Sequence, residues 1–146
     1  MGDELEALTE RLRRLGAPIS EDWASSKLKN DIPQTARYVA MRNLWPDLIH
    51  TWRDAEVLTR VPAARALLDA GLAPDAVSKA MCVAAYQAVV GTLWELTGGD
   101  QAPDGAPYVA LMEVDEDGNL TGREAGGLHE DLLSLDPTGQ EGADFL

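Results

Sequence analysis

The segment from Pro74 to Thr97 constrains the fold of this chain more than any other. It carries no charge between Lys79 and Glu95, and its apolar residues fall on every side of a helical wheel. A helix that is apolar all round is typical of a protein interior. We therefore predict a central buried helix over about residues 74–97. Its predicted packed positions are Met81, Ala85, Ala88, Val89 and Leu93.

The ends of this helix are marked by residues that favour helix boundaries. Gly71 stops the preceding helix, Pro74 suits a first helical position, and Asp75 suits the positive N-terminal end. Gly98-Gly99 can end the helix. The uncharged stretch is short of the about 18 residues that a membrane span requires, so the sequence predicts no transmembrane helix.

The N-terminal residues 3–15 form an amphipathic helical pattern. Leu5, Leu8, Leu12 and Leu15 repeat at the spacing of a coiled-coil seam. Two heptads are too few for a free coiled coil, which usually needs about three or four. The seam therefore packs either on the core of the same chain or on a second subunit.

Further helical patterns lie before residue 74, and the fold class is therefore mainly α, a helical bundle. The predicted segments are 20–29, 31–44, 46–60 and 62–70. Asp31 is expected to cap the second of these, and Trp45-Pro46 is expected to break or kink the chain after it. An apolar stripe in the third segment is formed by Trp45, Leu48, Ile49, Trp52 and Ala55.

The residues after the long helix change in character. Residues 98–107 are rich in Gly and Pro and predict a loop, and a small β-hairpin is predicted over about residues 108–123, with its turn at Asp117-Gly118. A short helix over 128–135 is expected to complete a single domain of residues 1–135. Residues 136–146 are predicted to form an acidic, loosely ordered tail.

The charge of the chain limits its partners. The net charge is −13, and basic side chains are needed to contact the phosphates of nucleic acids or of anionic lipids. We therefore expect no nucleic-acid or membrane partner, while a protein with a basic surface would suit this charge. The acidic N-terminus predicts no signal peptide, so we expect a cytoplasmic protein, and the preference for Arg over Lys is typical of GC-rich bacteria.

Asp47, His50 and Asp54 form the first candidate site. Their spacing places two carboxylates and an imidazole on one helix face, a set that could bind a metal or supply a general base. A solvated polar face in an acidic protein explains the same spacing. A metal site in a helical bundle would also need ligands from a facing helix, and the sequence contains no Glu-x-x-His repeat.

The run from Asp115 to Asn119 resembles the opening of an EF-hand loop in its alternating oxygen ligands. The resemblance then fails, because Leu120 and Gly126 stand where glycine and a bidentate glutamate are needed. A polar hairpin turn explains the same residues. Three weaker candidates have ordinary explanations: Cys82 as core, His129-Glu130-Asp131 as a wet helix face, and Arg11, Arg13 and Arg14 as partners of nearby glutamates.

These features predict a non-enzymatic protein-interaction or regulatory module that forms a homodimer. The acidic surface, the leucine seam and the hairpin edge favour this reading, and the sequence contains no nucleotide or flavin motif, so we expect no cofactor. The alternative is a small metal-dependent enzyme or metal-binding protein that uses Asp47, His50 and Asp54. A weaker alternative is an acidic inhibitor that occupies the basic site of a nucleic-acid enzyme.

Overall fold

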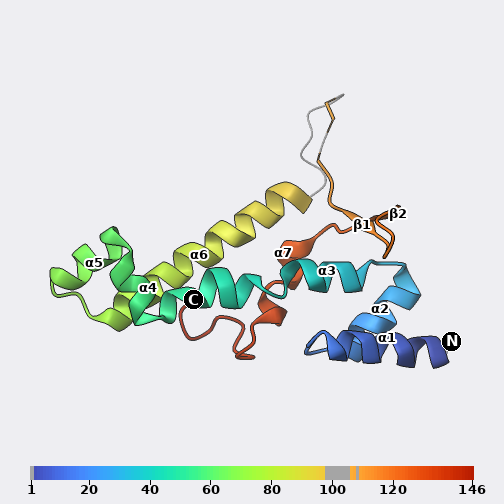
Figure 1. The fold of residues 1–146 in the computed structure, drawn as a ribbon, viewed down its shortest axis with the longest axis horizontal. Coiled ribbons are helices and arrows are strands. Elements are labelled where there is room, and N and C mark those ends of the chain that lie inside the picture. Colours follow the sequence, from blue (N-terminus) through green and yellow to red (C-terminus); the bar gives the residue numbers. More distant parts are fainter. Residues whose placement is uncertain (1, 98–105, 108) are drawn as a thin grey trace.

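The computed structural model describes residues 2–97, 106–107 and 109–146. The predicted helix stop at Gly98-Gly99, most of the predicted loop of 98–107, and Tyr108 at the start of the predicted hairpin lie outside the described residues. The fold is mainly helical with a small antiparallel hairpin near the C-terminus, which confirms the predicted fold class. Figure 1 shows an elongated molecule with α1 and α2 at one end and α4 and α5 at the other.

The first two helices form an antiparallel pair that encloses the leucine seam. These are α1 (Gly2–Arg14) and α2 (Ser20–Asn30). Leu12 is fully buried, and Leu5, Leu8 and Leu15 pack against the same core. Gly16 turns the chain between the helices at a φ of +90°, a backbone region that glycine adopts freely. The seam is therefore occupied within the monomer.

The third helix starts later than the sequence predicts. Asp31 does not cap it; it ends α2 in the left-handed conformation, with a φ of 53°. Helix α3 (Gln34–Met41) begins after Pro33, whose fixed φ suits the entry to a helix. Asp31 lies beside Ile32-Pro33, and the residue before a proline avoids the helical region, which delays the start.

The predicted helix of residues 46–60 is divided into three parts. A π-helical turn, η1 (Trp45–Ile49), is followed by a 3-10 turn, η2 (His50–Arg53), and by α4 (Ala55–Arg60). Pro46 has no N–H to donate, and the His50 amide instead bonds to the Trp45 carbonyl five residues back. Because the helix changes its winding here, the residues of the predicted apolar stripe no longer share one face. Trp45 and Ile49 are buried, while Leu48 is 48 % exposed.

Two short helices cover one end of the long helix. Asp54 accepts a hydrogen bond from the Glu56 amide and so caps α4. Helix α5 (Pro62–Asp69) follows, and Gly71 closes it at a φ of +89°. Leu58, Ala64 and Val77 form a small separate core between α4, α5 and the start of the long helix.

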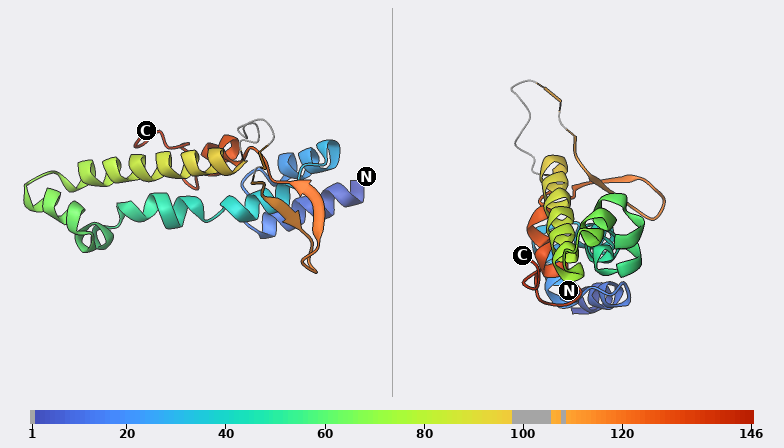
Figure 2. Two further views of the ribbon diagram at one scale, coloured as in Figure 1. Left: turned by 90° about the horizontal axis from the view of Figure 1, so that it is seen from above. Right: turned by 90° about the vertical axis from the view of Figure 1, so that its left-hand side faces the viewer.

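Helix α6 (Pro74–Thr97) has the predicted bounds, but the prediction that it is buried on all sides is wrong. Its buried residues are Val77, Cys82, Tyr86 and Thr97. Met81, Ala85, Val89 and Leu93 are partly exposed, and Ala88 is exposed. In the left-hand view of Figure 2, α3 and the turns that follow it run along one side of α6. The apolar residues of α6 therefore lie on two different sides, one packed against the domain and one exposed to solvent.

The hairpin and the last helical turns follow the predicted order. Strand β1 (Met112–Val114) pairs antiparallel with β2 (Leu120–Glu124), and their register is irregular between Met112 and Val114. Helix α7 (Leu128–Asp131) and the 3-10 turn η3 (Leu133–Leu135) then return to the core. Arg37 of α3 donates hydrogen bonds to the carbonyls of Gly126 and Gly127 and fixes the loop before α7.

The main core is centred on Trp45, which is fully buried. Its indole Nε1 donates a hydrogen bond of 2.7 Å to the Leu132 carbonyl, so a large apolar side chain has its one polar atom satisfied. The Trp45 ring also packs near the rings of Tyr86 and Phe145. This core joins α3, η1, α6, α7 and the C-terminal residues.

The C-terminal residues 136–146, predicted to be loosely ordered, instead pack on the domain. Phe145 lies against Trp45, His50 and Tyr86, and Asp144 pairs with Arg53 at 2.6 Å. The buried Asp136 carboxylate accepts hydrogen bonds from the amides of Thr138 and Gly142, which organises the turn. An aromatic anchor and a buried carboxylate outweigh the local signs of disorder in this Gly-rich acidic sequence.

Candidate functional site

Asp47, His50 and Asp54 do not converge in the structure. Asp47 is exposed, Asp54 caps α4, and the His50 side chain is only 14 % exposed. The π-helical and 3-10 turns between them replace the regular α-helix on which the shared face depended. Among the described residues, no group of three or more His, Cys, Asp or Glu side chains could hold a metal ion, so the geometry gives the metal hypothesis no support.

His50 instead lies beneath the C-terminal segment. Its Nε2 is buried 3.8 Å from a carboxylate oxygen of Asp136, and its ring contacts Trp45 and Phe145. Burial lowers the pKa of His50, and Arg53 lowers it further, whereas Asp136 and Asp144 raise it. The net result is a largely buried histidine that favours its neutral form.

The two remaining reactive candidates are parts of the packed structure. The Cys82 thiol is buried and donates to the Ile49 carbonyl at 3.4 Å, and burial raises its pKa, which disfavours the reactive thiolate. His129 packs its ring edge against Trp94, with 4.5 Å between the ring centroids. Asp131 pairs with Arg37 at 2.5 Å. These contacts explain the residues without catalysis.

The Asp115–Asn119 run forms a hairpin turn. One Asp115 carboxylate oxygen accepts hydrogen bonds from the amides of Asp117 and Asn119, and Gly118 adopts a φ of +83°. The Asn119 amide is the largest of several donors that lower the pKa of Asp115. The carboxylate therefore stabilises the turn itself, as the hairpin reading predicts.

A surface that the sequence did not predict is the outer side of α6. We call it the α6 open face and define it by the exposed residues Ala76, Ala80, Ala84, Gln87, Ala88, Gly91 and Trp94. At about 3.6 residues per turn these positions cover roughly a third of the helix circumference. The seven residues themselves carry no charge, but the exposed Glu95 lies within the same arc of the helix, beside Trp94. His129 covers part of Trp94, with 4.5 Å between the two ring centroids.

Small residues dominate the α6 open face. A Cβ atom built at Gly91 meets nothing within 4 Å, so the monomer gives no steric reason for glycine at this position. Glycine inside a helix costs about 0.5–1 kcal/mol relative to alanine. In membrane proteins, small residues let helix backbones approach closely, and Gly91 would allow such an approach on the open face.

α6 is apolar over most of its length, between Lys79 and Glu95. By length and composition it is the one helix in the described residues that could cross a membrane, and 22 % of its most apolar window is buried. A partly buried core helix passes the same test. The open face is made largely of Ala, Gly and Gln rather than the large aliphatic residues that favour lipid.

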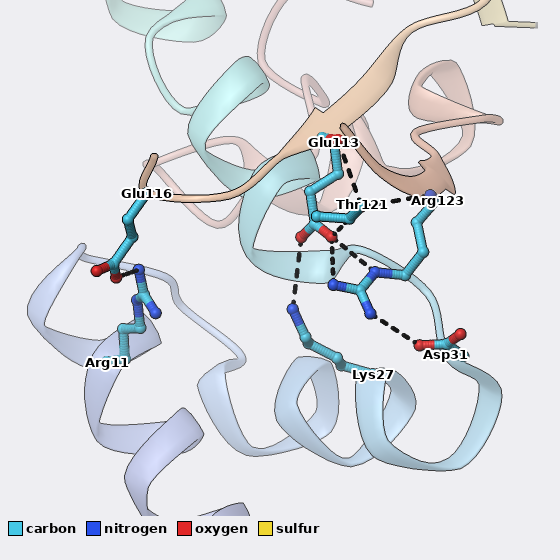
Figure 3. A network of polar contacts seen from close by, with 7 residues as sticks. All are labelled: Arg11, Lys27, Asp31, Glu113, Glu116, Thr121 and Arg123. Carbon is cyan, nitrogen blue, oxygen red and sulfur yellow. Dashed lines mark hydrogen bonds and ion pairs between the residues drawn. The ribbon is translucent and has the colours of Figure 1, made fainter. Parts of the chain in front are cut away.

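The second surface feature is a polar network that ties the hairpin to the first helices (Figure 3). Glu113 of β1 is central to it. Its carboxylate lies 2.5 Å from the Arg123 guanidinium and 3.5 Å from the Lys27 ammonium, and it accepts a hydrogen bond of 2.9 Å from the Thr121 hydroxyl. Burial raises the pKa of Glu113, but the hydrogen bonds from Arg123 and Thr121 outweigh it and leave the pKa below its ordinary value.

Two further ion pairs extend this network at its edges. Arg123 also reaches Asp31 at the end of α2, at 3.1 Å, and Arg11 of α1 pairs with Glu116 of the hairpin turn at 3.0 Å. Of the arginines expected to pair with nearby glutamates, Arg13 does so with Glu10 at 2.6 Å, while Arg11 reaches across the chain instead. The network therefore holds the hairpin over α1 and α2.

A groove of about 750 Å³ lies between the hairpin and the first three helices. We call it the hairpin groove. Its apolar lining comes from Leu8, Leu28, Ala36, Val39, Met112 and Val114. Val39, Met112 and Val114 are also among the exposed large hydrophobic side chains of the molecule. Sequence periodicity marked the helices and the hairpin but could not show that they meet here, because the contact joins residues about a hundred positions apart.

No family model, curated protein or solved structure matches the chain.

Proposed function

We propose that this chain is a non-enzymatic protein-interaction module that forms a homodimer through the α6 open face. The observation that carries the proposal is the open face itself: a strip of mostly small residues along a 24-residue helix, exposed to solvent in the monomer, with Glu95 as the one charge in its arc. Apolar strips of this length on soluble proteins mark contacts with other macromolecules. The leucine seam of α1, the earlier candidate interface, is occupied within the monomer.

The order of residues along α6 favours an antiparallel pair. Ala80 lies seven residues before Gln87, and Trp94 lies seven residues after it. In a two-fold pair centred on Gln87, each Trp94 would lie against Ala80 of the partner subunit, a large side chain against a small one. Small residues between these positions allow helix axes to approach to about 8 Å. One self-complementary face is sufficient for the commonest closed symmetry.

Charge sets a further expectation for the dimer. Each copy carries −13, so the acidic surfaces repel one another, while the open face has a single charge in its arc, Glu95 near one end. Added salt screens this repulsion without weakening an apolar contact. Self-association should therefore persist or strengthen as the salt concentration rises.

Light scattering of the full chain over a range of concentrations tests the proposal. We expect a dimer for the native chain and a monomer for Ala84→Arg, because the substitution places a charge in the centre of the open face. Ala66→Arg is the matched control, since Ala66 is an exposed helical alanine on α5 and should leave the dimer intact. A native chain that remains monomeric at micromolar concentration overturns the proposal.

Cysteine cross-linking tests the antiparallel arrangement separately. In a Cys82→Ser background, Gln87→Cys lies on the proposed two-fold axis, and its two copies should form a disulfide on mild oxidation. Ala80→Cys should not, because its copies lie at opposite ends of the contact. Equal cross-linking at both positions would indicate a parallel pair. A monomer that floats with lipid vesicles would instead assign the open face to a membrane and contradict the proposal.

A further inference from the structure

The hairpin groove is lined by more carboxylates than cations, so two carboxylates are left without an ion-pair partner among the described residues. Each of its three cations is already paired with a carboxylate of the hairpin: Arg11 with Glu116, and both Lys27 and Arg123 with Glu113. The same lining also contains the carboxylates of Glu4 and Asp115, and no described cation forms an ion pair with either. The groove therefore combines an apolar floor with a residual negative rim.

The two strands border the groove in different ways. From β2 only Thr121 and Arg123 line it, an alternation that belongs to one face of a strand. From β1 and the following turn the lining is continuous, over residues 112–116. A continuous lining is typical of a strand edge, where the backbone itself is accessible. In the described residues the sheet has two strands, so the second edge of β1 has no strand partner.

We propose that the hairpin groove binds an extended segment of a partner protein, with apolar side chains at alternate positions and a flanking Lys or Arg. The segment would add to the free edge of β1, where main-chain hydrogen bonds supply affinity and side-chain pockets supply selectivity. Its apolar side chains contact the floor near Val39 and Met112. Its basic flank faces Glu4 and Asp115, and this charge also suits a protein with a net charge of −13.

This inference rests on the proposed role as an interaction module, but it concerns a surface separate from the dimer contact. The open face lies on α6, whereas the groove is built by α1, α2, α3 and the hairpin. Figure 1 shows the hairpin beside α2 and α3, at the end of the molecule remote from α4 and α5. The groove can therefore be tested without disturbing self-association.

Fluorescence anisotropy with three labelled heptapeptides tests the chemistry of the segment. The first probe is Gly-Lys-Val-Thr-Val-Lys-Gly, the second replaces both lysines with glutamate, and the third carries N-methyl groups on the first valine and the threonine, whose N–H groups point to opposite edges of a strand. We expect saturable binding of the first probe. The glutamate probe should bind at least about tenfold more weakly because it meets the acidic rim. The N-methyl probe should also lose about tenfold, because it cannot donate to a strand edge.

Variants of the protein locate the binding. Val39 is 44 % exposed, so Val39→Arg should fold normally and abolish binding of the lysine probe. Leu67→Arg is its matched control, since Leu67 is 42 % exposed on α5, outside the groove. Glu4→Lys should weaken binding more than Asp3→Lys does, because both change the first turn of α1 in the same way but only Glu4 lines the groove.

The binding of the probe and the formation of the dimer can be tested independently with two variants. Val39→Arg should remain dimeric, and Ala84→Arg should still bind the lysine probe. The inference is overturned if the lysine probe shows no saturable binding up to millimolar concentration, or if Val39→Arg and Leu67→Arg bind it equally. Equal binding of the N-methyl probe would exclude strand addition and contradict the proposal in the form stated here.

Discussion

Helices α1 and α6 use their apolar residues in opposite ways. α1 is amphipathic, and its leucine seam packs on the core: Leu12 is fully buried, and Leu5, Leu8 and the adjoining Leu15 are partly buried. α6 is apolar on every side, yet its outer side remains exposed, with Trp94 at 45 %. Periodicity therefore located the buried face of α1 correctly, whereas uniform apolarity did not imply that α6 is enclosed. An amphipathic pattern predicts which side of a helix is packed. A uniformly apolar pattern predicts only that no side requires contact with water.

The largest expected effect comes from comparing a buried leucine of α1 with an exposed leucine of α6. Leu12→Ala should lower the free energy of unfolding by about 2–5 kcal/mol, because it removes a fully buried side chain and leaves a cavity. Leu96→Ala on α6 should cost much less, since Leu96 is 38 % exposed. Urea denaturation of both variants gives the two values. Equal losses would mean that α6 is as enclosed as α1, contrary to the structure.

The free energy of unfolding should depend on pH through His50, which lies on the packed side of α6. His50 lies in the aromatic cluster that includes Tyr86 of α6, and burial and Arg53 hold its pKa below the ordinary value despite Asp136 and Asp144. The folded protein binds this proton less readily than the unfolded chain. Stability should therefore be complete above the unfolded pKa of about 6.5 and decrease as the pH falls below it.

Urea midpoints measured at a series of pH values between about 7.5 and about 5 test this expectation. The Asp136 pKa is also below its ordinary value, because hydrogen bonds from Gly142 and Thr138 outweigh the effect of burial, so its own contribution is lost only at more acidic pH. His50→Gln should be less stable but should lose most of the dependence in this window. Retention of the full dependence in His50→Gln would assign it to another group.

Gly91→Ala should have opposite effects on folding and on association. Alanine fits the monomer without a clash and should raise the stability of the folded chain by about 0.5–1 kcal/mol, because it restricts the unfolded backbone. If α6 pairs closely with a second copy, the added methyl group should weaken the dimer. Thermal melts and light scattering of the same sample measure both effects. A variant that is more stable and equally dimeric would move the close contact away from Gly91.

The smallest effect is expected on the outer side of α1. Arg13 and Glu10 form an ion pair between two largely exposed side chains. Arg13→Gln should change the free energy of unfolding by less than about 0.5 kcal/mol, because solvent screens such pairs. Comparison with Leu12→Ala by urea denaturation shows how far the stability of α1 resides in its buried face. A loss near that of Leu12→Ala would contradict this division.

Local patterns predicted much of the fold. Proline positions located the starts of α5 and α6, and Asp117-Gly118 located the turn of the hairpin, since these boundaries depend on neighbouring residues. The division of residues 46–60 was not predictable from periodicity, because Pro46 changes the winding and rotates the side chains that follow. The docking of Phe145 and the burial of Asp136 depend on contacts distant in sequence, which a local signal of disorder cannot reveal.

The candidate site was less accessible to sequence reasoning than the fold. Asp47, His50 and Asp54 shared a face only on the assumption of a regular α-helix, and the structure has π and 3-10 turns there. The hairpin groove arises from elements at opposite ends of the chain. One local signal could have indicated the open face: Gly91 in the middle of a helix, where glycine is unfavourable unless a close approach requires it.

The contact between Trp94 and His129 has a spectroscopic consequence. Trp94 lies on the open face, while its indole also touches the imidazole of His129. Trp45 and Trp23 are buried and therefore report on unfolding, but Trp94 is half exposed and adjoins the proposed contact. A variant retaining Trp94 as its sole indole, with the others replaced by Phe, would emit at shorter wavelength when water leaves the open face. The chain thus contains its own optical reporter of self-association.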